Sequence, residues 1–289
     1  TSSVKRSGTT DTEASVTAED KKPNSAGYVF DESAENILKG TIAGDGSLVL
    51  KVYFKQQFTV TYEPGTHGTF PSQKKENLDY GTATPGFEGE TTGDAGYAFA
   101  GWAPEVAETV TGNATYTAQW KANEDTKYTV EYYYQNEDGS YPTSTNMKRE
   151  DRGTTDTRAD VTDGDKTPEK AGYVFDATNG SNVLSGTIAG NGSLVLKVYF
   201  KLQFTVTYKP GTQGTFEDQK TENLDYGTET PAFEGTPSGN AGYTFAGWTP
   251  SVAGTVTRNA DYVAQWTADE DTAYTVEYYY EENGAYPET

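Results

Sequence analysis

Residues 50–62 read LKVYFKQQFTVTY, and their even-numbered positions are apolar except at position 56. Such alternation with a period of two predicts a β-strand that buries one face. Neither glycine nor proline interrupts the run, and one apolar parity continues across residues 55–57, so we expect a stiff joint there. At its second occurrence the strand is followed by Pro210-Gly211, a dipeptide that predicts a turn.

The chain repeats itself almost completely. GTTDT at residues 8–12 returns at 153–157, and FAGW at 99–102 returns at 245–248, so the offset is 145 residues and becomes 146. Self-similarity at a fixed period is typical of a modular array. A chain built from near copies favours a role that scales with copy number over a single catalytic site.

Each period contains two unlike modules. The first type opens with YTVEYYY at 128–134 and ends with LVLKVYFK at 194–201, whereas the second type carries GYTFAGW at 242–248. Polar, acidic linkers separate a second-type module from the next first-type one, and we expect these joints to bend. The predicted order is a first-type module lacking its first strand (1–57), a second-type module (58–120), a linker (121–127), a complete first-type module (128–202), a second-type module (203–266), a linker (267–273) and the first hairpin of a further first-type module (274–289).

The composition predicts small, aromatic-rich, mainly β modules. The chain has 22 Tyr, 12 Phe and 4 Trp, although its hydrophobic content is only 34%. Each aromatic ring buries a large area, so small cores can be built from few residues. Short helices at 34–38 and 182–184, ended by Gly40 and Gly186, complete the expectation of an α+β, strongly β-rich fold.

The charge excludes several partners. Lys and Arg number 22 against 43 Asp and Glu, which gives a net charge of −21. Such a field repels nucleic acid and anionic membranes. No apolar run approaches the roughly 20 residues that span a bilayer, so we expect no membrane insertion in this segment. We expect the chain to be a piece of a longer protein whose signal and anchor lie outside it.

The residues offer little for catalysis, so we expect no enzyme, cofactor or metal site. Cysteine is absent, and the single histidine, His67, aligns with Gln213 in the other copy, which favours a surface turn residue. Carboxylates recur in both copies at turn-like or alternating positions typical of solvated faces. They are Asp31 and Asp176, Glu76 and Glu222, Asp79 and Asp225, Glu88 and Glu234, and Glu131 and Glu277.

Two further chemistries are disfavoured. Glu124-Asp125 and 269–271 could supply oxygen ligands to calcium at the joints, but their spacing does not match an EF-hand loop. A Lys–Asn isopeptide bond needs a buried lysine, whereas Lys51 and Lys197 lie opposite the apolar stripe of their strands.

Exposed tyrosines are the candidate binding residues. Tyr133 and Tyr279 have the opposite parity to their tyrosine neighbours, so they could face solvent and stack on sugar rings. The alternative is that they are partly solvent-exposed tyrosines on the outer face of a sheet, with no binding role.

These residues also carry a family resemblance. GYTFAGW at 242–248, followed by a strand that ends in Ala264-Gln265-Trp266, resembles the internalin B-repeat, also called the Listeria-Bacteroides repeat. YTVEYYY at 128–134 and GSLVLKVYFK at 192–201 are similar to the mucin-binding-protein (MucBP) repeat of Gram-positive surface proteins. Together the two resemblances cover nearly the whole chain.

The resemblance implies tandem β-grasp, ubiquitin-like modules in an elongated array of a wall-anchored adhesin on the bacterial cell surface. Many such modules are spacers, and no catalytic residues are attached to either family. We therefore expect a stalk that projects a distal head domain, with neighbouring repeats as its partners. The alternative is low-affinity, multivalent binding of mucin glycans or host matrix by the repeats.

The two ends of the sequence suggest one more alternative. Residues 274–280 repeat the opening strand of a first-type module, and the module at 1–57 lacks that strand. Strand addition between copies would then give head-to-tail fibres.

Overall fold

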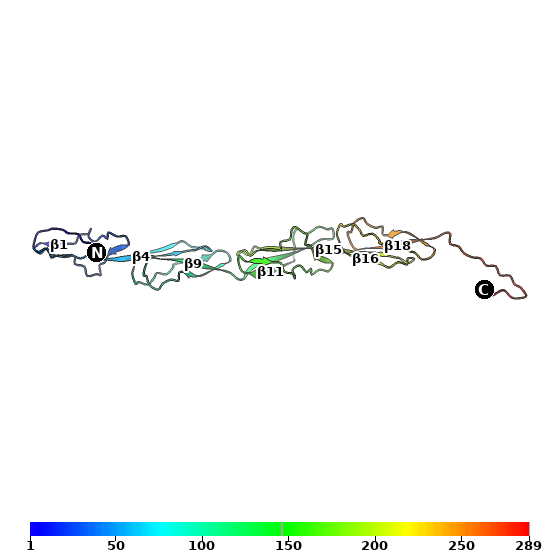
Figure 1. Cartoon of the computed structure of the whole chain (residues 1–289), viewed down its shortest axis with the longest axis horizontal. Coiled ribbons are helices and arrows are strands. Elements are labelled where there is room, and N and C mark those ends of the chain that lie inside the picture. Colours follow the sequence, from blue (N-terminus) through cyan, green and yellow to red (C-terminus); the bar gives the residue numbers. More distant parts are fainter. Residues whose placement is uncertain (146, 289) are drawn as a thin grey trace. The chain divides into compact units, whose positions relative to one another are not determined.

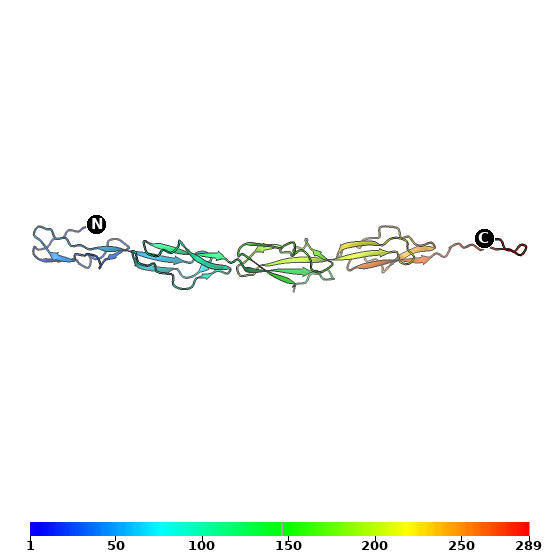
Figure 2. The ribbon, with the colours of Figure 1, turned by 90° about the horizontal axis from the view of Figure 1, so that it is seen from below.

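The chain is all-β. The computed structural model describes residues 1–145 and 147–288, and within them it contains strands, turns and loops but no helix (Figure 1, Figure 2). The described residues accordingly include no helix that could cross a membrane. The expected α+β, β-grasp fold was wrong, because a β-grasp module needs a helix packed across its sheet.

Asparagine side chains occupy the place of the expected helices. The amide of Asn182 donates to the carbonyl oxygens of Asp176 (2.7 Å) and Asn179 (2.9 Å), and its Oδ1 accepts from the backbone N–H of Tyr199 (3.0 Å). Asn36 makes the equivalent bonds in the other copy. Local side-chain bonds of this kind compete with helical backbone bonds. The segments therefore fold as loops, and residue 183 forms a β-bridge with residue 197.

The chain forms two compact units. Unit 1 comprises residues 1–126, 152–157 and 188–192, and unit 2 comprises residues 127–151, 158–187 and 193–289.

The sheet of unit 1 is organised around one strand, β4. This strand pairs antiparallel with β2 at its start, antiparallel with β6 further along, and parallel with β9, which pairs in turn with β8. Two small two-stranded sheets, β1–β3 and β5–β7, accompany it. The strands are β1 (Glu13–Ser15), β2 (Tyr28–Phe30), β3 (Lys39–Thr41), β4 (Phe54–Glu63), β5 (Gly68–Thr69), β6 (Gln73–Asp79), β7 (Thr92–Gly93), β8 (Tyr97–Ala103) and β9 (Ala114–Ala122).

Unit 2 is organised in the same way around β15, with one addition. A parallel strand, β10, pairs with the first half of β15, and β11 lies beyond it in the strand order β11-β10-β15-β18-β17. The strands β13 and β16 also pair with β15, and β12 pairs with β14. The strands are β10 (Thr126–Tyr134), β11 (Lys148–Gly153), β12 (Arg158–Asp160), β13 (Tyr173–Phe175), β14 (Ser185–Thr187), β15 (Val195–Lys209), β16 (Gln219–Asp225), β17 (Tyr243–Thr249) and β18 (Ala260–Ala268).

One strand serves two modules in each unit. β15 runs for 15 residues without a break and so crosses the expected boundary between residues 202 and 203. The sequence predicted a stiff joint between two strands, and the structure has a single strand through this joint. In unit 1 the strand begins only at Phe54, and residues 50–53 contribute a single bridge, between Lys51 and Ile37. Their counterparts in unit 2 are held by β10, and no such strand pairs with residues 50–53 in the described part of the chain.

Aromatic rings fill the cores, as the composition predicts. In the second-type module of unit 1, Tyr62 is 1% exposed, and its ring centroid lies 4.8 Å from that of Trp102. The equivalent pair in unit 2, Tyr208 and Trp248, is 4.7 Å apart. Each tyrosine hydroxyl donates to a proline carbonyl, Pro85 in one module and Pro231 in the other. The buried residues of these two cores are Phe58, Val60, Tyr62, Val110 and Tyr116, and Phe204, Val206, Tyr208, Val256 and Tyr262.

The two expected linkers, 121–127 and 267–273, are short. Strands β9 and β10 leave only residues 123–125 between them as a turn, and residues 269–271 form the equivalent turn after β18. After that second turn, residues 272–281 belong to no strand, and the red end of the ribbon carries no arrow (Figure 1). The strand expected at 274–280 is therefore absent, although a bridge between Glu282 and Ala285 closes a small hairpin beyond it.

Candidate functional site

The candidate site lies in the first-type module of unit 2, where β10 lies beside β15. The two strands pair in parallel from Thr129 opposite Val195 to Tyr134 opposite Phe200. Parallel strands are usually covered on both faces. Accordingly, residues of both parities are buried: Leu196, Val198 and Phe200 are each 0% exposed on one face, and Tyr133 (5%) and Tyr199 (9%) are buried on the other.

Tyr133 lies inside this module. Its side chain is 5% exposed, its ring stacks on Tyr199 with centroids 4.6 Å apart, and Lys197 Nζ lies 5.8 Å from the ring centroid. Its hydroxyl donates to Glu131 (2.7 Å). Burial first, and then this hydrogen bond, raise the pKa of Tyr133 to about 12. The expectation that strand parity exposes Tyr133 to a sugar ring was wrong, because covered parallel strands bury both parities.

Tyr279, the second predicted binding residue, has a different environment. It is 41% exposed and lies outside every strand, and its hydroxyl contacts Glu277. The two tyrosines therefore share a sequence context and a local hydroxyl–carboxylate bond, but not a surface.

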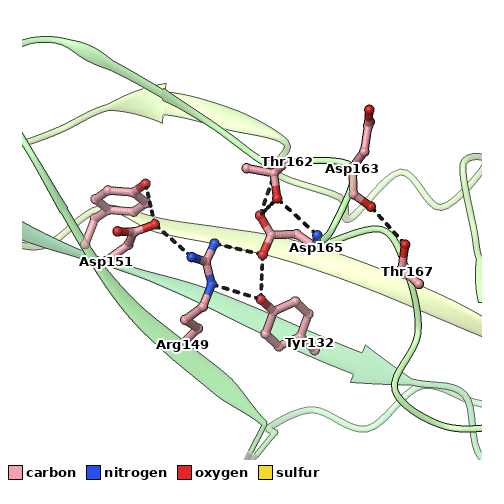
Figure 3. Close-up of polar contacts among 8 residues, drawn as sticks. Tyr132, Arg149, Asp151, Thr162, Asp163, Asp165 and Thr167 are labelled. Carbon is pink, nitrogen blue, oxygen red and sulfur yellow. Dashed lines mark hydrogen bonds and ion pairs between the residues drawn. The ribbon is translucent and has the colours of Figure 1, made fainter.

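A buried carboxylate, Asp165, organises the polar part of the site (Figure 3). Its side chain is 4% exposed. It accepts hydrogen bonds from the Tyr132 hydroxyl (2.7 Å), from Arg149 Nη2 (2.8 Å), and from the backbone N–H and hydroxyl of Thr162 (2.8 and 2.7 Å). Arg149 also pairs with Asp151, which accepts a bond from Tyr128 as well. The cluster ties β10, β11 and the 162–165 turn together.

The hydrogen bonds decide the ionisation of Asp165. Burial alone raises the pKa of a carboxyl group, but the bonds from Tyr132 and Thr162 and the charge of Arg149 outweigh it, so the pKa of Asp165 lies below its ordinary value. Burial raises the pKa of Tyr132, and its bond to Asp165 raises it further. An ionised carboxylate held by four donors has no free position for proton transfer, so the arrangement acts as a brace.

The sequence analysis did not predict this cluster, although part of it could have been predicted from residue spacing. Thr162 and Asp165 exchange bonds in both directions, since the Asp165 N–H also donates to the Thr162 hydroxyl (3.1 Å). Thr17 and Asp20 make the same exchange in the other copy. The Thr-x-x-Asp spacing resembles a capping box and was the available signal. Arg6 binds Asp20 in unit 1, and this bond contributes most to holding the pKa of Asp20 below its ordinary value.

The remaining predicted residues make structural or surface contacts. His67 is exposed in a bend and stacks on Tyr97, with ring centroids 4.1 Å apart. Asp176 is 8% exposed and accepts bonds from Thr178 and from the Tyr141 hydroxyl (2.9 Å). Other recurring carboxylates form ion pairs with lysine, as Lys75–Glu88 (2.9 Å) does.

The carboxylates of the 121–127 joint also have basic partners. Glu124 pairs with Lys121 (2.8 Å) and Asp125 with Arg152 (3.3 Å). Within residues 1–145 and 147–288, no group of three or more His, Cys, Asp or Glu side chains is arranged to hold a metal ion.

No protein-family model matches the chain, and no curated protein matches it as a relative.

Proposed function

We propose that the chain is a run of spacer repeats from a bacterial surface adhesin, which hold a distal head domain away from the cell wall. The observation that carries the proposal is the shared strand. In unit 2, β15 belongs to the first-type module through β10 and β13, and to the second-type module through β16 and β18. Bending at residues 201–203 would break ladder bonds of both modules, so this joint resists bending.

Side-chain contacts reinforce the same joint in both units. Lys201 donates to Asp225 (2.5 Å), and the Gln203 N–H donates to the Gly172 carbonyl (2.8 Å). In unit 1, Lys55 and Asp79 form the equivalent pair (2.5 Å), and the Gln57 N–H donates to Gly27 (2.7 Å). The same contacts stabilise this joint in both units. Such a joint suits a repeat whose role is to extend a protein away from the cell wall.

Small-angle scattering tests the spacer role. The maximum dimension of the intact chain should be that of modules strung out lengthwise. Inserting Gly-Gly-Ser between Lys201 and Leu202 should broaden the distance distribution, because it breaks the continuity of β15. The matched control inserts the same residues after Thr236, which is exposed in a loop of the same unit. A compact wild-type particle would contradict the proposal.

The second candidate function, weak multivalent binding of mucin glycans or host matrix, is favoured by one observation. Tyr278 and Tyr280 are each 77% exposed, and open aromatic faces are what sugar rings stack on. A glycan array probed with residues 1–289 and with residues 1–273 tests it. Signal that depends on residues 274–289 would support binding, and equal or absent signal would remove it.

A further inference from the structure

The turn between β9 and β10 is held more firmly than its sequence predicts. The polar, acidic run at 121–127 predicts a joint that bends, but the two strands leave only residues 123–125 between them. Two segments from far along the chain, 152–157 and 188–192, contact this turn. They belong to unit 1, although most of the first-type module from which they come belongs to unit 2.

Thr155 makes the central contact with the turn. Its N–H donates to the Asn123 carbonyl oxygen (2.9 Å), and its hydroxyl oxygen lies 2.7 Å from that of Thr126. Both threonines are buried, since Thr155 is 3% and Thr126 is 8% exposed. Hydrogen bonds shielded from water are electrostatically stronger than the same bonds on an open surface. The buried pair therefore favours a turn that stays in contact with residues 152–157.

Bonds to charged groups flank this buried pair. The Tyr97 hydroxyl donates to the Asp156 carboxylate. Arg152 Nη1 donates to the carbonyl oxygen (3.0 Å) and to a carboxylate oxygen (3.3 Å) of Asp125. Charge-assisted bonds of this kind are stronger than neutral ones. The bond to Asp156, and then burial, hold the pKa of Tyr97 above its ordinary value.

Two glycines allow the backbones to come close at the same place. A Cβ on Gly190 would lie 1.8 Å from the Ala95 carbonyl oxygen, and one on Gly96 would lie 2.4 Å from Gly190 Cα. Both distances are shorter than real Cβ contacts. Gly190 does not have a positive φ, so its own turn does not require glycine. The close approach of Ala95 is what excludes a side chain at residue 190.

The two contacting segments are joined to each other inside the first-type module. The Asp156 N–H donates to the Ile188 carbonyl (2.9 Å), and the Ile188 N–H donates to the Thr157 carbonyl (2.9 Å). Residues 152–157 and 188–192 therefore present one ordered surface. A surface that is already ordered loses little conformational entropy when it docks.

We propose that residues 152–157 and 188–190 form a docking surface for the end of the preceding second-type module, at residues 95–97 and 123–126. The partner of this surface is thus the adjacent module of the same chain. Docking keeps the joint at 123–125 closed in solution, although its polar, acidic sequence is that of a bending linker.

Gly190 and Gly96 determine the specificity of this fit, because a side chain at either position would keep the two backbones apart. The inference does not depend on the spacer role. Its failure would leave a bending joint at 123–125, and the strand shared across residues 201–203 would be unaffected.

Hydrogen exchange of the full chain, read at single amides by NMR, tests the docking. The Thr155 N–H has its acceptor across the joint, whereas the Val161 N–H donates to Leu184 within the first-type module (2.8 Å). The Thr155 amide should exchange at least about a hundredfold more slowly than an open amide, because it is released only when the contact opens. An unprotected Thr155 amide beside a protected Val161 amide would overturn the proposal.

A matched pair of substitutions tests the close approach. Gly190→Gln should speed exchange of the Thr155 amide by about tenfold or more and leave the Val161 amide unchanged, because the new side chain collides across the joint. The control is Gly180→Gln in an exposed turn of the same module, where a Cβ meets nothing within 4 Å. The control should change neither amide. Equal effects of the two substitutions, or no effect of Gly190→Gln, would refute the docking.

Tyr97 provides a second variant and a second readout. Tyr97→Phe lies outside the docking surface of residues 152–157 and 188–190, so it does not disturb the fold of that surface. It keeps the ring that stacks on His67 but removes the bond to Asp156, and it should speed Thr155 exchange by about threefold.

In Gly190→Gln, NMR titration should find the pKa of Tyr97 closer to its ordinary value, because opening the contact breaks the bond to Asp156. A Tyr97 pKa that stays raised in this variant would contradict the opening.

Discussion

The two copies of the first-type module have nearly the same sequence but different interiors. In the copy at 128–202, Leu196 and Val198 are 0% exposed and Ile188 is 2% exposed. In the copy at 1–57, the equivalent Leu50, Val52 and Ile42 are only half-buried. The difference between them is β10, which pairs with β15 in one copy, whereas within residues 1–145 and 147–288 no strand pairs in this way with residues 48–54. One strand therefore decides whether this module has a sealed core.

A matched pair of truncations gives the largest expected effect. Leu196→Ala should lower the free energy of unfolding of its module by about 4 kcal/mol, because it leaves a cavity in a sealed core. Leu50→Ala should cost about 1–2 kcal/mol, since its side chain is already partly in water. Native-state hydrogen exchange, read at the amides of residues 196–200 and 50–54, separates the two modules. Equal losses would mean that β10 does not seal the core.

The brace at Asp165 gives an intermediate effect that depends on pH. Asp165→Asn should cost about 2 kcal/mol at neutral pH, because bonds to a charged group are lost. The pKa of Asp165 is lower in the folded chain than in the unfolded chain, so its contribution is present above about pH 4 and is lost as the pH falls through the folded pKa.

Denaturant unfolding of the wild type and of Asp165→Asn across this pH range provides the measurement. The variant should lose part of the acid sensitivity of the wild type. Asp20→Asn is the companion change in the other copy, where Arg6 supplies the cation. Identical pH profiles of the wild type and Asp165→Asn would contradict the assigned role.

A pair of hydroxyl deletions gives the smallest effect. Tyr133→Phe should cost about 1 kcal/mol, because it removes a largely buried bond to Glu131 while the ring stack remains. Tyr279→Phe removes the same local bond in an exposed segment and should leave stability unchanged. Spectrophotometric titration offers a second readout, since Tyr133 should ionise only near its raised pKa of about 12. A stability loss on Tyr279→Phe would contradict the exposed placement of Tyr279.

Local patterns predicted much of the molecule. Alternation at 50–62 and its copy predicted strands on both sides of each joint, and the aromatic content predicted ring-filled cores. The helices failed at 34–38 and 182–184, where a short apolar pattern was overruled by the side-chain bonds of Asn36 and Asn182. Only part of the site could be predicted from the sequence. The Thr162–Asp165 exchange is local, but Arg149 and Tyr132 reach Asp165 from other strands.

The sequence by itself determined the repeat, the strand periodicity, the acidic surface and the lack of thiol chemistry, because each of these depends on residue identity or on neighbours along the chain. Only the tertiary structure decided which faces are buried. YTVEYYY is an inner strand at 128–134 and an exposed segment at 274–280, although the seven residues are identical. Burial requires a partner strand from a distant part of the sequence. The seven residues alone do not determine whether such a strand pairs with them.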